Sequence, residues 1–141
     1  MIDALSEDVR LNPNESHPLV ERGVAFGFIG EYEKAFADFD EAIRLDTKNA
    51  KAWYNRAVTW RGKEEYDKAI ADYDEAIRLD SSYVAAFIGR GVTWGRKEEY
   101  EKAVADFDAA LLLDPDDEYA TENRTLMMLA IKAKKMLKSK P

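Results

Sequence analysis

Apolar residues recur along this chain in steps of three and four, which is the spacing of an amphipathic helix. Between residues 66 and 79 the apolar positions are Tyr66, Ala69, Ile70, Tyr73, Ala76, Ile77 and Leu79. Residues 50–63 carry a second stripe, formed by Trp53, Ala57 and Trp60, with Tyr54 and Val58 beside it. The pattern therefore predicts two helices, joined by a short charged turn that follows Gly62.

This helix pair returns along the chain at a fixed step of 34 residues. The segment 53–60 recurs at 87–94, and residues 65–80 recur at 31–46 and, with changes, at 99–114. A lone helix pair cannot bury its apolar faces, so a period of this length is typical of stacked helix–turn–helix units. We therefore predict three units, which span residues 16–49, 50–83 and 84–117.

Large and small residues occupy matching places in the three units, which predicts how the helices cross. The small positions are Gly23, Ala57 and Gly91, with Ala35, Ala69 and Ala103. The large ones are Leu19, Trp53 and Phe87, with Phe39, Tyr73 and Phe107. We expect each large side chain to enter the gap that a small residue leaves between two helix axes.

A charged pair also repeats at the same step. Arg22, Arg56 and Arg90 stand on the first helix of each unit, and Asp38, Asp72 and Asp106 follow sixteen residues later on the second helix. An unpaired guanidinium between packed helices is costly. We therefore expect these arginines to bind carboxylates within or between neighbouring units.

The two ends of the chain depart from the period. Residues 1–15 end in a segment that is similar to the tail of a second helix, and they are either part of a preceding unit or an N-terminal cap. Residues 118–138 are predicted to form one long closing helix with an apolar side of Leu126, Leu129, Ile131, Ala133 and Leu137. Lysines crowd its far end, which favours a solubilising cap and leaves a membrane or partner-binding surface as alternatives.

Composition narrows the classes of protein that fit. The chain has 141 residues, of which 46% are hydrophobic and 35% charged, so it is too apolar for a disordered chain. It carries a net charge of −7, and residues 124–141 alone hold six cations and no acid. The acidic remainder argues against nucleic-acid binding. Without a run of about 20 apolar residues or a signal peptide, membrane contact is not favoured and a cytoplasmic location is the default expectation.

Catalytic and metal-binding patterns are not found in the sequence. His17 is the sole histidine, and cysteine is absent. Paired acids such as Asp72 and Asp74 recur in every unit, so they belong to the repeat rather than to one active site. The acidic stretch from Asp114 lacks the glycine and glutamate that a calcium loop requires. We therefore predict neither an enzyme nor a cofactor or metal site.

The repeated residues resemble the tetratricopeptide repeat. The residues that match its signature in the second unit are Trp53, Ala57, Tyr66, Ala69, Tyr73 and Ala76. In the third unit they are Phe87, Gly91, Tyr100, Ala103, Phe107, Ala110 and Pro115. The resemblance covers residues 16–117 and implies an all-α fold, a right-handed superhelix of three units with a partial N-terminal unit and a capping helix. It also implies a scaffold that binds a short peptide or protein segment in a concave groove.

The resemblance also points to groove residues on the first helices. The candidates are Val20, Val24, Tyr54, Asn55, Val58, Arg61, Ile88, Val92 and Arg96. Some family members hold a peptide's C-terminal carboxylates at places that here carry Val20, Val24, Asn55, Ala85 and Gly89, and only Asn55 matches. Two alternatives stay open. Val58 and its equivalents could instead complete the packing between helices, and the protein could associate with itself through its terminal units.

Overall fold

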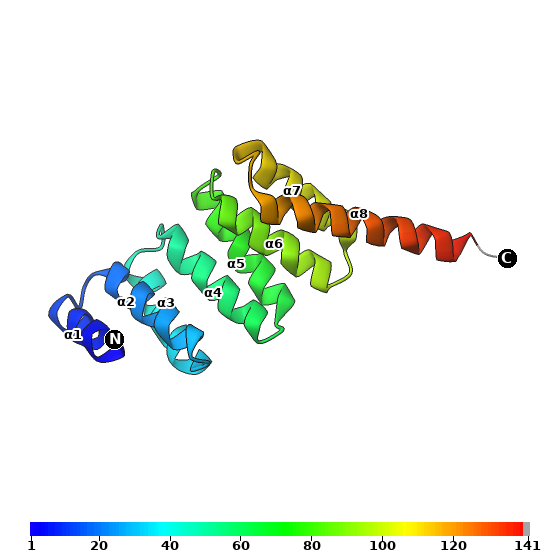
Figure 1. Cartoon of the computed structure of the whole chain (residues 1–141). Helices are drawn as coiled ribbons and strands as arrows, with labels where there is room; N and C mark the ends of the chain where they lie inside the picture. The colour runs from blue at the N-terminus through cyan, green and yellow to red at the C-terminus, as the bar shows by residue number, and fades with distance from the viewer. Residues whose placement is uncertain (140–141) are drawn as a thin grey trace. The chain divides into compact units, whose positions relative to one another are not determined.

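The structure, a computed structural model, describes residues 1–139, and every regular element within that range is an α-helix (Figure 1). The chain divides into two compact units that are larger than the single repeats, one up to Asp80 and one from Ser81. From here on, the first and the second unit mean these two parts of the chain. The first unit contains α1 (Ile2–Leu11), α2 (Ser16–Phe28), α3 (Tyr32–Leu45), α4 (Ala50–Gly62) and α5 (Tyr66–Leu79). The second contains α6 (Val84–Arg96), α7 (Tyr100–Leu113) and α8 (Glu118–Lys138). The all-α helical-repeat fold predicted from the sequence is confirmed.

The turns inside the three hairpins share one backbone geometry. In each, the second residue after the helix end has a left-handed conformation: φ is 82° at Gly30, 60° at Glu64 and 61° at Glu98. The next amide then donates back across the end of the helix, as Glu65 N does to Trp60 O at 2.9 Å. Such a bond satisfies a carbonyl that would otherwise lack a partner at the helix end. Gly62, which marked this turn in the sequence, is itself the last helical residue of α4.

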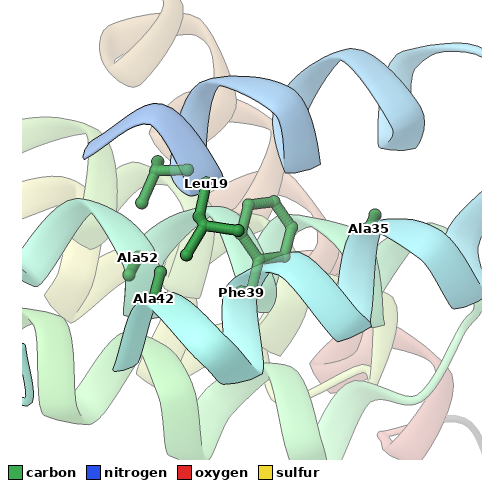
Figure 2. Close-up of a cluster of buried hydrophobic side chains, with 6 residues drawn as sticks. Leu19, Ala35, Phe39, Ala42 and Ala52 are labelled. Atoms are coloured by element: carbon green, nitrogen blue, oxygen red, sulfur yellow. The ribbon is translucent and has the colours of Figure 1, made fainter. Parts of the chain in front are cut away.

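A buried cluster holds α2, α3 and α4 of the first unit together (Figure 2). Leu19 and Phe39 fill its centre, with Ala35, Ala42 and Ala52 around them. A Cβ placed on Gly23 would lie 2.6 Å from a ring carbon of Phe39, so the ring occupies the space that glycine leaves. In the second unit, a Cβ on Gly91 would lie 3.0 Å from the ring of Phe107. The predicted pairing of large with small residues is therefore confirmed at these two crossings.

The expected ion pairs are also confirmed. Arg22, Arg56 and Arg90 each donate two hydrogen bonds, of 2.7 to 2.9 Å, to the carboxylate sixteen residues later, on Asp38, Asp72 and Asp106. These planar two-bond contacts are the strongest geometry available to an arginine and a carboxylate. The aspartates are buried and the arginines half-buried, so the charges neutralise each other inside the hairpins.

A second contact extends this pattern to the preceding helix. Arg56 on α4 also donates to Asp40 on α3 at 2.9 Å, and Arg124 on α8 binds Asp108 on α7 at the same sequence spacing. Arg22 makes the equivalent contact with Ser6 on α1, at 3.5 Å. Each of these arginines therefore joins its helix to the helix before it as well.

The closing helix α8 packs with a different side from the one expected. Its contacts with α6 and α7 involve Ala120, which is fully buried, Arg124, which binds Asp108, and Met127, whose sulfur would lie 3.0 Å from a Cβ on Gly95. Of the predicted apolar side, Leu126, Leu129, Ala133 and Leu137 are exposed, and only Ile131 is half-buried. The reason is register: Arg124 takes the place of the repeated arginine and thereby fixes which side of α8 meets α7.

Candidate functional site

A hollow opens on the first unit where α2 and α4 run beside each other. Its volume is about 330 Å³, and its walls are formed by Val24, Gly27, Phe28, Tyr32, Phe39, Asn55, Val58, Thr59, Arg61 and Gly62. Four of the nine predicted groove residues are among them: Val24, Asn55, Val58 and Arg61.

Two glycines shape this hollow. A Cβ on Gly27 would stand 3.5 Å from the Thr59 hydroxyl oxygen, and one on Gly62 would stand 3.4 Å from the Tyr32 hydroxyl oxygen. Both distances are at or near ordinary contact, so any larger side chain at these two places would fill space that is now open. The hollow therefore depends on two small residues in its wall, Gly27 on α2 and Gly62 on α4.

A second hollow of about 610 Å³ adjoins the first. Val24 and Phe28 line both, so the two form one continuous surface along α2. The second is completed by Met1, which precedes α1, by Leu5 of α1, by His17, Val20, Glu21 and Ala25 of α2, and by Lys51 of α4. Phe28 is 90% exposed, which is unusual for a phenylalanine that has no partner to cover it. We name this surface, formed by the linings of the two hollows, the α2–α4 groove.

Asn55 and Arg61 supply polar groups to the α2–α4 groove. The Asn55 amide nitrogen donates to the Lys51 carbonyl oxygen at 2.9 Å, and this bond leaves the amide oxygen as an acceptor. Arg61 has no ion-pair partner among residues 1–139, whereas the other arginines of the first unit are all paired. The first hollow thus combines an apolar floor with the Asn55 acceptor and the unpaired Arg61 cation, and the second hollow adds the polar groups of His17, Glu21 and Lys51.

Tyr54, a predicted groove residue, lies outside the α2–α4 groove. Its ring centre is 5.9 Å from that of Tyr73 on α5, and neither hollow includes it. Burial raises the pKa of the Tyr54 hydroxyl, and the positive charge of Arg61 opposes that increase. Tyr54 is therefore half-buried against α5 and does not line either hollow.

The remaining predicted groove residues have other surroundings. Val20 is buried in the core cluster and also lines the second hollow. In the second unit, Ile88 and Val92 are half-buried against the core of α7 and α8, and Arg96 is exposed at the end of α6. The packing of Ile88 and Val92 agrees with the alternative interpretation, in which Val58 and its equivalents complete the packing between helices.

Sequence reasoning missed the groove residues Gly27, Phe28 and Tyr32. Tyr32 is the first repeat's equivalent of the signature residues Tyr66 and Tyr100, which suggests a purely structural role. Phe28 could have been noticed in the sequence, because it departs from the repeat: the equivalent positions 34 and 68 residues later hold Gly62 and Arg96. A departure from the period thus marks a position that packing alone does not require.

Two observations bear on other kinds of site. Within residues 1–139, no three His, Cys, Asp or Glu side chains lie close enough together to hold a metal ion. No helix in the same range combines the length and the apolar character that crossing a membrane requires.

Repeated hairpins with one shared ion pair and one shared turn define a helical-repeat protein. The chain belongs to the tetratricopeptide repeat family: models of that repeat match residues 17–49, 50–83 and 88–117. Proteins of this family are interaction scaffolds and are generally not enzymes. None of the curated proteins compared with the chain matches its sequence.

Solved structures of tetratricopeptide-repeat domains are similar to this chain. The second such domain of human RPAP3, in complex with the HSP70 peptide SGPTIEEVD, is 31% identical with a TM-score of 0.74, and the match covers 80% of this chain and 98% of that one. The Arabidopsis OM64 domain is 29% identical with a TM-score of 0.79, over 83% of this chain and 97% of that one. The first such domain of Spaghetti (RPAP3), bound to the HSP90 peptide SRMEEVD, has a TM-score of 0.81 at 24% identity over 84% and 94%, and this likeness concerns the fold alone.

Proposed function

We propose that the protein is an interaction scaffold that binds a short, extended peptide segment in the α2–α4 groove. The single observation that carries the proposal is the open hollow beside Phe28, where an exposed aromatic ring and two valines surround space sufficient for an apolar side chain. Apolar pockets with a few directed polar groups are the usual form of a binding site.

The polar groups favour a particular kind of segment. The Asn55 amide oxygen can accept a hydrogen bond from a peptide N–H, and Arg61 can bind an acidic side chain. The apolar floor between them suits one aliphatic or aromatic anchor, which would supply most of the binding energy. The preferred ligand is therefore an apolar residue followed or preceded by an acid.

A peptide partner also agrees with the relatives, because the similar second domain of human RPAP3 was solved with an HSP70 peptide. The mode of binding proposed here is different in one respect. Val20 and Val24 stand where the resemblance expects polar clamp residues, and Val20 is buried. Recognition therefore depends on the apolar hollow and on internal acidic side chains, and a free peptide C-terminus is not required.

The test begins with a displayed library of random heptapeptides, selected against the full chain. Enriched peptides are then synthesised with amidated C-termini, and their affinities are measured by calorimetry for the wild type and for Phe28→Ala. The matched control is Ile29→Ala, because Ile29 is the next residue, is also exposed and lines neither hollow.

We expect Phe28→Ala to weaken binding by about tenfold or more, equivalent to about 1.4 kcal/mol. Ile29→Ala should leave the affinity within about twofold of the wild type, since a residue outside the contact changes little. Arg61→Leu should reduce the affinity of peptides that contain an acid and leave others unchanged. A library that yields no binding peptide, or peptides that bind Phe28→Ala as well as the wild type, would overturn the proposal.

A further inference from the structure

The closing helix α8 carries a second apolar face that no other part of the described chain covers. Its positions are Tyr119, Glu122, Leu126, Leu129, Ala133 and Met136, all of them exposed. We name this set the α8 seam. It is distinct from the packed side of the helix, where Ala120, Arg124 and Met127 meet α7 and α6. Its four large members are each more than half exposed, from 54% to 64%: Tyr119, Leu126, Leu129 and Met136. The adjacent Leu137 is 70% exposed.

The spacing of the α8 seam indicates what kind of surface it fits. Successive members are three, four, three, four and three residues apart. This alternation is the seven-residue pattern through which two helices pack side by side along a left-handed seam. At about 1.5 Å per residue the seam is roughly 25 Å long, which suits a partner that is itself a helix of similar length.

The charges of α8 indicate the direction of that partner. The start of the helix is acidic, with Asp116, Asp117, Glu118 and Glu122, and its end is basic, with Lys132, Lys134, Lys135 and Lys138. Two copies of α8 placed parallel would bring like charges together at both ends. Two copies placed antiparallel bring the acidic start of each beside the basic end of the other, which is complementary at both ends.

We propose that α8 pairs antiparallel with α8 of a second copy of this chain through the α8 seam. In that register Leu126 lies against Leu129 of the other copy, and Tyr119 lies against Met136. Glu122 meets the small Ala133, so its carboxylate reaches past a methyl group to the neighbouring Lys132 of the other copy. The contact is self-complementary, as a twofold interface requires, and it is separate from the α2–α4 groove.

The seam is short and contains one charged and one small member, so the association should be weak and reversible. The test is sedimentation equilibrium of the full chain from low micromolar to millimolar concentration. The wild type should rise in mass toward a dimer, and Leu129→Glu should stay monomeric throughout. The matched control is Leu112→Glu: Leu112 is 86% exposed on α7 and lies outside the seam. This control should associate like the wild type.

A charge exchange then tests the antiparallel direction. Lys132→Glu alone should weaken association, because it places an acid beside Glu122 of the other copy. Adding Glu122→Lys in the same chain should restore association, since each exchanged residue again meets an opposite charge. A wild type that remains monomeric at all concentrations, a Leu129→Glu variant that associates normally, or a double exchange that fails to restore association would overturn the proposal. Circular dichroism of each variant confirms that helical content is unchanged.

Discussion

The ion pair between Arg56 and Asp72 should respond very differently to the loss of each partner. The Asp72 side chain is 7% exposed and accepts both of its hydrogen bonds from Arg56, whose side chain is 20% exposed. Arg56 keeps two further contacts if Asp72 is removed: Asp40 at 2.9 Å, and the ring of Trp53 4.9 Å from the guanidinium carbon. Asp72 has no other donor among residues 1–139.

These differences set the expected magnitudes. Arg56→Leu leaves a buried carboxylate without compensation, which costs about 3–5 kcal/mol of the free energy of unfolding. We place it at the lower end, about 3 kcal/mol, because the carboxylate retains slight access to water. Asp72→Leu leaves a partly exposed cation that still has Asp40, so we expect about 1–2 kcal/mol. The double variant removes both charges and replaces them with leucines, which should be close to neutral or even stabilising.

The assay is urea unfolding followed by circular dichroism, with the four proteins of the double-mutant cycle measured side by side. The slope of the free energy against urea must stay constant across the set, because repeat proteins can lose two-state behaviour. The reasoning predicts a double variant that is more stable than either single variant. If the two single losses simply add in the double variant, or if Asp72→Leu costs more than Arg56→Leu, then the pair is not held as the structure describes.

Three further predictions concern packing and backbone. Ala69 is fully buried and Ala71 is exposed, so Ala69→Leu should cost roughly 1–3 kcal/mol by overpacking, whereas Ala71→Leu should leave the melting temperature nearly unchanged. Gly23→Ala places a methyl group 2.6 Å from the Phe39 ring and should lower the melting temperature. Gly91→Ala places one 3.0 Å from the Phe107 ring and should be nearly neutral, because a gain in helix propensity of about 1 kcal/mol offsets the strain. Glu64→Gly should stabilise by roughly 0.5–1 kcal/mol in urea unfolding, since glycine adopts positive φ without strain; a loss of stability there would show that the Glu64 side chain has a role of its own.

The repeat period predicted most of the fold from the sequence. Residues one period apart occupy equivalent packing positions, so Phe39, Tyr73 and Phe107 could be recognised as buried large residues from the sequence alone. The same reasoning placed the arginine–aspartate pairs, because a charge that recurs on an apolar face needs a recurring partner. These predictions succeeded because they used position within the period and not hydrophobicity alone.

The exceptions have physical causes as well. The packed side of α8 was mispredicted because leucines were weighted above the register of Arg124, which the ion pair with Asp108 fixes. The turn after α4 appeared to depend on Gly62, but helix-end hydrogen bonds hold Glu64, and its equivalent Glu98 after α6, in the strained conformation. The α2–α4 groove could be predicted only in part, because its shape depends on where two helices diverge, and the sequence does not specify that distance.

The arginine contacts to preceding helices also bear on how the first unit opens. Arg56 bonds to α3 and α5 together, so separating α4 from either neighbour breaks a charged contact, and the helices from α2 to α5 should exchange their amide hydrogens as one cooperative block. The contact from Arg22 to α1 ends on the neutral hydroxyl of Ser6 at 3.5 Å, where the equivalent position on α3 is the aspartate Asp40. With only this weak polar link beside the packing of Val9 on the core cluster, α1 should detach in brief local openings long before the block unfolds. Each opening would uncover the edge of the α2–α4 groove that Met1 and Leu5 line.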